Sequence, residues 1–229
     1  MLDIKKLEDK TGVRVIKENL FRTAFIHKSY VNEHRDEKLE HNERLEFLGD
    51  AVLELASTNY LFLQCPTRPE GELTAFRSAL VKGEHLAKVA VKLELGQYLF
   101  LSNGEEKSGG RTKNYILANT LEALIGAIYL DSGYIVAEKF IKKFVLTNLN
   151  EIIDKKLYID AKSRFQEDCQ EKRSVTPHYE CLAEDGPDHN KIFTMGAYIG
   201  EEKVAEGKGA SKQKAEDDAA TNALKALKW

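Results

Sequence analysis

Apolar residues recur at helical spacing through the first two thirds of the chain. Two segments show the pattern clearly, one with Leu45, Leu48, Val52 and Leu55 and the other with Leu117, Leu121, Leu124 and Ile128. Intervals of three and four residues place side chains on one face of an α-helix. Glycine and proline cluster in residues 65–71 and 102–111, where we expect the helices to be interrupted. The pattern predicts an almost entirely helical domain over residues 3–150.

The pattern changes after residue 150. A short polar stretch at residues 151–159 is predicted to be a linker. Beyond it we expect a helix, three strands and a second helix, at residues 161–172, 178–183, 191–199, 203–206 and from 211 to the end. Gly186, Pro187 and Gly200 separate the strands as hairpin connections do. This α-β-β-β-α order predicts a small α+β domain over residues 160–228.

Acidic side chains gather on one face of each of two predicted helices. At 100° per residue, Glu43, Glu46 and Asp50 lie within about 60° of one another. On the second helix Asn119 and Glu122 are three residues apart, and Glu122 is almost the only charge in a strongly apolar segment. Carboxylates this close repel one another unless a cation lies among them.

These carboxylates have two interpretations. On an arbitrary helix, the common case is a solvated acidic face neutralised by surface cations such as Arg44 or Lys38. The alternative is a Mg²⁺ site, because Mg²⁺ prefers oxygen ligands and combines carboxylates with water and substrate phosphate. The apolar neighbours Phe47, Leu48 and Val52 favour this alternative, since an enclosed carboxylate needs a compensating charge. Two such faces meeting across a core predict metal-assisted hydrolysis of phosphodiesters by one or two ions.

Five segments resemble the ribonuclease III family. They are residues 25–30 (FIHKSY), 42–51 (NERLEFLGDA), 77–81 (RSALV), 107–110 (KSGG) and 117–126 (LANTLEALIG). The resemblance implies an all-α nuclease domain followed by a double-stranded-RNA-binding domain, as in the bacterial enzymes. It also implies a homodimer with one centre per subunit, which cuts both strands of double-stranded RNA and leaves 5′-phosphates and short 3′ overhangs. The expected role is the processing of ribosomal RNA precursors and other structured RNAs, including mRNA and tRNA.

The resemblance assigns roles to the acidic residues. Glu46, Asn119 and Glu122 would be ligands of Mg²⁺, or of Mn²⁺ in its place. Asp50 and Glu122 would be catalytic, and Glu43 would lie near the subunit interface and support substrate binding or packing. The family usually has Asp where this chain has Asn119; an amide oxygen can bind Mg²⁺ but brings no charge. We therefore expect weaker metal binding or an altered metal preference.

Two rival functions compete with the nuclease, and Asn119 prompts the first of them. The first is a catalytically weak or inactive protein that binds double-stranded RNA and keeps the fold. The second is a structural helical dimer that acts in ribosome assembly. Both predict RNA binding without cleavage. The unpaired carboxylates of Glu46, Asp50 and Glu122 argue against both, because a protein that only binds polyanionic RNA has no use for them.

The C-terminal domain resembles a double-stranded-RNA-binding domain at residues 164–167 (RFQE), 186–189 (GPDH) and 207–216 (GKGASKQKAE). Gln166 and His189 are expected to reach 2′-hydroxyls and base edges in the wide minor groove of A-form RNA. Three lysines near a predicted helix N-terminus are expected to contact phosphates, namely Lys208, Lys212 and Lys214. The alternative is that Ser211 merely caps this helix and that the lysines form a solvated first turn.

Charge and cysteine content limit the partners. The chain has a net charge of −3, and residues 159–229 carry 11 Lys and Arg against 14 Asp and Glu. RNA binding must therefore rest on local patches. Cys65, Cys169 and Cys181 are far apart, which favours a reducing cytoplasm over a disulfide framework or zinc site. No apolar run approaches the roughly 20 residues that a membrane span needs, so no membrane partner is expected.

Two other chemistries are not supported by the sequence. His27 and Ser29 could belong to a nucleophilic triad, but no strand-turn-helix nucleophile elbow surrounds them. Gly104, Gly109 and Gly110 lack the spacing of a phosphate-binding GxxxxGK[ST] loop, and no small-molecule cofactor is expected.

Overall fold

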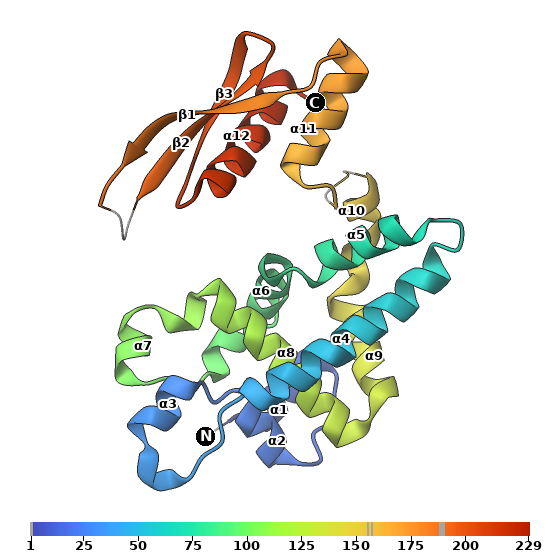
Figure 1. The fold of residues 1–229 in the computed structure, drawn as a ribbon. Coiled ribbons are helices and arrows are strands. Elements are labelled where there is room, and N and C mark those ends of the chain that lie inside the picture. The colour runs from blue at the N-terminus through green and yellow to red at the C-terminus, as the bar shows by residue number, and fades with distance from the viewer. Residues whose placement is uncertain (1, 155, 157, 188–190) are drawn as a thin grey trace. The chain divides into compact units, whose positions relative to one another are not determined.

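The computed structural model describes residues 2–154, 156, 158–187 and 191–229 (Figure 1). It divides the chain into two compact units, Met1–Tyr158 and Ile159–Trp229. The first unit is built from helices and the second from a three-stranded antiparallel sheet with two helices, so the predicted fold class is confirmed. Within the described ranges, no helix has the length and apolar character to span a membrane.

The first unit contains ten α-helices and four short 3-10 helices within its described residues. In chain order they are α1 (Ile4–Thr11), α2 (Glu18–Ala24), α3 (Lys28–Glu33), η1 (Arg35–Glu37), α4 (Glu43–Gln64), α5 (Glu70–Val81), α6 (Gly83–Lys92), η2 (Leu95–Tyr98), α7 (Asn103–Lys107), η3 (Gly110–Thr112), α8 (Asn114–Ser132), α9 (Tyr134–Phe144), η4 (Leu146–Asn148) and α10 (Leu149–Asp154).

Helix α8 is the centre of this unit. Its residues are apolar on nearly all sides, and those from Ile116 to Ile128 are almost all buried. A helix that is hydrophobic all round must be surrounded by other elements. Helices α2, α4, α6 and α9 pack against it (Figure 1). Glu122 is therefore carried by the best-packed element of the unit.

Helices α4 and α8 cross with their backbones in contact. A β-carbon on Gly49 would collide with the carbonyl group of Glu122, and one on Gly126 would collide with the carbonyl oxygen of Leu45. Only glycine fits at these two positions. The group that approaches Gly126 so closely is the backbone of α4.

Two expectations for the first unit were wrong. Leu55 was predicted on the core face of its helix but is 58% exposed, because α4 turns Gly49, Val52, Leu53 and Ala56 toward the core. Residues 151–159 were predicted to be a linker, yet they begin inside helix α10. Ile152 is buried there, and the ring of Tyr158 packs edge-on against Phe76 at a centroid distance of 4.5 Å. Apolar contacts thus place Ile152 and Tyr158 in the first unit.

The second unit follows the predicted element order. It consists of α11 (Ala161–Arg173), β1 (His178–Asp185), β2 (Ile192–Ile199), β3 (Glu202–Gly209) and α12 (Lys212–Leu227), with the sheet in the order β1-β2-β3. Met195 and Ala197 of β2 form a core with Phe165 of α11 and the alanines of α12. The Ser211 side chain accepts a hydrogen bond from the Lys214 backbone N–H at 3.2 Å and caps α12.

Strand β3 is longer than predicted. The predicted strand ended at residue 206, but residues 207–209 complete it, where Met195 pairs with Gly207 and Phe193 with Gly209. A β-carbon on Gly207 would collide with the backbone of Ala219. The glycines are therefore needed for close packing of the strand under α12 rather than for a turn.

We predict that Gly49→Ala lowers the free energy of unfolding by about 2–3 kcal/mol, because an extra methyl forces α4 away from α8. Urea denaturation followed by circular dichroism measures this change. Gly71→Ala is the control, since nothing lies within 4 Å of a β-carbon at that site; its stability should stay the same or rise slightly. Equal stability of the two variants would contradict the close crossing.

Candidate active site and RNA-binding surface

The helix crossing brings together four polar side chains that the sequence analysis selected. Glu46 and Asp50 lie on α4, beside Gly49, while Asn119 and Glu122 lie on α8. The Asn119 amide donates a hydrogen bond to the Glu46 carboxylate, and both Asp50 and Glu46 act electrostatically on Glu122. Residues separated by about 70 positions in the chain thus form one acidic cluster.

Burial and like charge disfavour ionisation in this cluster. Burial is the main cause that raises the pKa of Glu122 to about 7, and the charges of Asp50 and Glu46 add to it. Burial also raises the pKa of Glu46, although the hydrogen bond from Asn119 opposes the shift. Among the described residues, no Lys, Arg or His forms an ion pair with Glu46, Asp50 or Glu122. The cluster therefore lacks the cation that would stabilise it.

The chemistry of the cluster suits a hard divalent cation. All its possible ligand atoms are oxygens, from three carboxylates and one amide, and Mg²⁺ and Mn²⁺ prefer such ligands. In the described part of the chain, no group of three or more His, Cys, Asp or Glu side chains is already placed to hold a metal ion. The fit rests on the donor types and on the unneutralised charge.

Glu43 is separate from this cation-free cluster. It lies exposed in the first turn of α4, where the Lys28 Nζ atom is 3.0 Å from its carboxylate. This ion pair lowers the pKa of Glu43. Glu43 also lines a groove of about 700 Å³ together with Phe47, Leu45 and Leu130.

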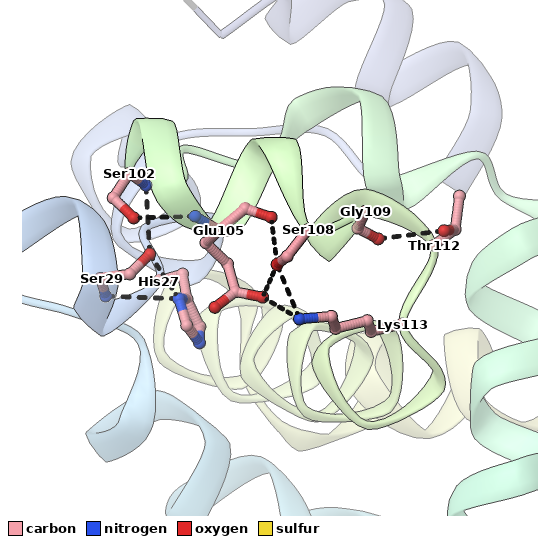
Figure 2. Close-up of polar contacts among 8 residues, drawn as sticks. All are labelled: His27, Ser29, Ser102, Glu105, Ser108, Gly109, Thr112 and Lys113. Atoms are coloured by element: carbon pink, nitrogen blue, oxygen red, sulfur yellow. Dashed lines mark hydrogen bonds and ion pairs between the residues drawn. The ribbon is translucent and has the colours of Figure 1, made fainter.

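A network of hydrogen bonds surrounds His27 (Figure 2). The His27 Nδ1 atom lies 2.8 Å from Ser29 Oγ, which accepts a hydrogen bond from the Ser102 backbone N–H at 3.1 Å. Ser102 in turn caps α7 by accepting from the Glu105 N–H. His27 and Ser29 therefore hold the start of α3 against the segment before α7, and the structure gives them a local structural role in place of a nucleophilic one.

The segment that leads into α8 is fixed by ion pairs. Lys113 Nζ lies 2.7 Å from the Glu105 carboxylate and 2.8 Å from Ser108 Oγ (Figure 2). Arg111 donates to the carbonyl oxygens of Gly96 and Leu99, both at 2.9 Å. Arg111 is therefore engaged within the protein, whereas the neighbouring Lys107 is exposed.

The structure places four of the five predicted RNA-binding residues on the second unit's surface. Gln166 on α11, Lys208 on β3, and Lys212 and Lys214 in the first turn of α12 are all exposed. The fifth, His189, lies outside the described residues. The lysines share one end of the sheet and helix with a helix N-terminus, a combination that suits phosphate binding.

One of these lysines is not free, which the sequence did not indicate. The Lys212 Nζ atom is 3.0 Å from a Glu184 carboxylate oxygen and lies over the ring of Phe193. Lys191 also approaches Glu184, at 3.4 Å. Glu184 is 28 residues from Lys212 in the chain, and the pairing of β1 with β2 and of β2 with β3 brings the two together. RNA must therefore compete with a carboxylate for Lys212.

Two family models match the chain and together cover most of it. The model described as Ribonuclease-III-like matches residues 17–149, and the one described as Double-stranded RNA binding motif matches residues 161–227. The first match lies in the unit with the acidic cluster and the second in the unit with the exposed lysines.

Relatives with the same overall length support these matches. The chain is 44% identical over 209 residues to Ribonuclease 3 of Borreliella afzelii, covering 91% of this chain and 85% of the relative. It is 43% identical over 225 residues to Ribonuclease 3 of Enterococcus faecalis, with 97% and 96% covered. The solved nuclease domain of ribonuclease III from Campylobacter jejuni, which has a region involved in dimer formation, is 40% identical. It superposes with a TM-score of 0.59 over 64% of this chain and 98% of its own.

We predict that Glu122→Gln stabilises the metal-free protein in a pH-dependent way. Because folding raises the pKa of this acid from 4.5 to about 7, the wild type loses stability as the pH rises between these values. In EDTA, the variant should be more stable than the wild type by about 1 kcal/mol at pH 8, allowing for partial exposure, and equal to it at pH 4. Thermal unfolding at both pH values measures this. A difference that does not change with pH would contradict the assigned shift.

We also predict that Glu184→Gln tightens binding of double-stranded RNA by about 2–5-fold, because Lys212 is released for a phosphate. Lys212→Gln should weaken binding and lower the slope against log salt concentration by about one. Gel-shift titration in EDTA at several salt concentrations measures both. Glu201→Gln removes an exposed carboxylate from the turn between β2 and β3 and serves as control for net charge. An equal gain in the control would mean that only net charge matters.

Proposed function

Because this chain belongs to the ribonuclease III family and is an endoribonuclease, we propose that it cleaves double-stranded RNA with a divalent metal ion held by Glu46, Asn119 and Glu122. The observation that carries the proposal is the acidic cluster at the crossing of α4 and α8. Three carboxylates meet there without a cation, in a unit otherwise well supplied with surface ion pairs. A cluster of this kind destabilises the folded protein, and binding of a cationic ligand would offset that destabilisation.

The protein's own residues have distinct tasks in this proposal. Glu122, with its raised pKa, exchanges a proton for the cation near neutral pH, so that metal loading is favoured as the pH rises through about 7. Asp50 is exposed at the edge of the cluster, where it can orient a water molecule or accept its proton. The bound Mg²⁺ or Mn²⁺ would supply Lewis-acid stabilisation of the phosphate and a water of lowered pKa.

Asn119 would contribute its amide oxygen while its N–H₂ group keeps the hydrogen bond to Glu46. An Asp at this position would add a fourth negative charge and would increase the attraction for the cation. The amide therefore predicts a working centre with reduced metal affinity. Complete loss of chemistry, leaving a protein that only binds RNA, is the alternative that the experiment below separates.

The second unit would hold the substrate. Gln166, Lys208, Lys212 and Lys214 are proposed to contact successive grooves and phosphates of an A-form duplex, and His189 is proposed to join them. Because the unit is net acidic, this contact should be local and sensitive to salt.

We further propose a homodimer that pairs two centres, one for each strand. Helix α4 exposes large apolar side chains next to the acidic cluster, among them Phe47 (80% exposed), Leu55 (58%) and Phe62 (68%). Contiguous apolar surface of this kind marks a protein interface. Phe47 borders the 700 Å³ groove that Glu43 also lines, which gives a second copy both an apolar anchor and a place to receive one. Cutting by two such centres would leave 5′-phosphates and short 3′ overhangs.

The proposed setting is a reducing cytoplasm. Cys65, Cys169 and Cys181 are all free thiols. The proposed substrates are ribosomal RNA precursors and other structured transcripts, including mRNA and tRNA.

We predict metal-dependent cleavage of an end-labelled RNA duplex by the purified protein, with none in EDTA. Glu122→Gln should lower the rate by at least about 100-fold, because it removes a charged ligand. Asn119→Asp should lower the Mg²⁺ concentration needed for half-maximal rate. Initial rates over a range of Mg²⁺ and Mn²⁺ concentrations measure these effects. Binding of the duplex without cleavage under either metal would replace the nuclease proposal with an RNA-binding function.

A further inference from the structure

Four carboxylates follow one another along one side of α4 at intervals of three or four residues: Glu43, Glu46, Asp50 and Glu54. They lie within about 80° around the helix axis, and the outermost two are about 16 Å apart along it. The outer two pair with cations, at 3.0 Å from Lys28 Nζ to Glu43 and 3.0 Å from Arg77 Nε to Glu54. The inner two belong to the proposed metal centre. Cations thus stand at both ends of the acidic row.

These two ion pairs contribute little to folding. The side chains of Lys28 and Glu43 are 61% and 47% exposed, and those of Arg77 and Glu54 are 33% and 39% exposed. Ion pairs as exposed as these typically add little to the stability of the fold. Both cations come from other helices, α3 and α5, so neither is the ordinary neighbour one turn away. Their position at the row therefore calls for a reason other than stability.

Arg77 is held firmly and still has donors available. Its Nε–H group donates to Glu54 and its Nη1 atom donates to Thr58 Oγ1 at 2.9 Å. The Thr58 hydroxyl donates in turn to the Glu54 carbonyl oxygen at 2.7 Å. A guanidinium carries five N–H groups. Within the described residues its Nη2 atom has no hydrogen bond or ion pair of this kind, so its N–H groups can bind an additional anion.

Lys28 is placed by the network of His27. It is the first residue of α3 and directly follows His27. The His27 ring nitrogen accepts a hydrogen bond from the Ser29 N–H, and Ser29 Oγ accepts one from the Ser102 N–H, so the start of α3 is held in place. Of its three ammonium hydrogens, one is used by Glu43. Lys28 also acts electrostatically on Glu46, one of the proposed metal ligands.

We propose that Lys28 and Arg77 bind the backbone phosphates on the two sides of the scissile phosphate, while Glu43 and Glu54 neutralise these cations when no RNA is bound. This inference rests on the proposed nuclease function. A row of carboxylates repels RNA, and cations at both ends of the row offset that repulsion where the strand enters and leaves. Arginine suits such a site because its planar fork can bind a carboxylate and a phosphate together.

Steady-state cleavage by the full chain tests the proposal. Lys28→Gln and Arg77→Gln should each raise KM by about 5-fold or more, leave kcat within about 2-fold, and reduce the salt slope of kcat/KM by about one. Lys82→Gln and Arg68→Gln are matched controls, since each breaks an exposed ion pair of the same kind, with Glu84 and Glu72. Both controls should behave as the wild type.

Glu54→Gln separates RNA binding from structural support. If Arg77 binds phosphate, removing its carboxylate partner leaves KM unchanged or lowers it. If the ion pair is only structural, Glu54→Gln and Arg77→Gln have the same raised KM and the same lowered melting temperature, and the inference is overturned. Size-exclusion chromatography accompanies each variant, because a change of oligomeric state in Arg77→Gln would assign the residue to subunit contact instead.

The remaining outcomes are also decisive. Unchanged KM and salt slope in both variants, with normal cleavage by the wild type, overturn the inference and leave the nuclease proposal intact. Absence of metal-dependent cleavage by the wild type overturns the nuclease proposal, and this inference falls with it.

Discussion

The contact between the backbones of α4 and α8 is the constraint on which the rest of the first unit depends. Without side chains at Gly49 and Gly126, the two helices approach until carbonyl oxygens fill the space that β-carbons would need. The same contact sets Glu46 and Asp50 opposite Asn119 and Glu122. Packing and chemistry therefore cannot be adjusted separately, since any residue that widens the crossing also spreads the carboxylates.

Much of this site could be predicted from the sequence because its signals are local. Carboxylates at helical spacing, and one charge in an apolar helix, indicate which faces must meet something polar. The orientation of apolar residues was harder to predict. Leu55 fits the helical period as well as Val52 does, but period alone does not distinguish a core-facing residue from one left exposed for a partner. The end of the first unit was predicted too early for a related reason. The stretch is mostly polar, and its sequence does not reveal that Ile152 and Tyr158 pack against the helical core.

Contacts between distant segments explain what the sequence could not give. Lys28 and Arg77 stand in segments that matched the family, yet nothing in the local pattern places them at opposite ends of the α4 carboxylate row. In the second unit, the pairing of β1 with β2 and of β2 with β3 brings Glu184 to Lys212, so that this lysine is already engaged in an ion pair. Gly207 and Gly209 look like a loop in the sequence because glycine serves both turns and close packing.

The hydrogen bond between Asn119 and Glu46 affects how the enzyme would respond to its supply of metal. Four carboxylates at this site would repel one another strongly in the metal-free protein and would bind the metal ion very tightly. The enzyme would then remain saturated with metal over a wide range of Mg²⁺ concentrations. The amide removes one charge and gives the empty centre an internal bond of its own. In the proposed function, such a centre would keep its shape when Mg²⁺ is scarce but would release the ion more readily. The activity would then depend on the free Mg²⁺ concentration of its surroundings, and the rate of RNA turnover would rise and fall with that concentration.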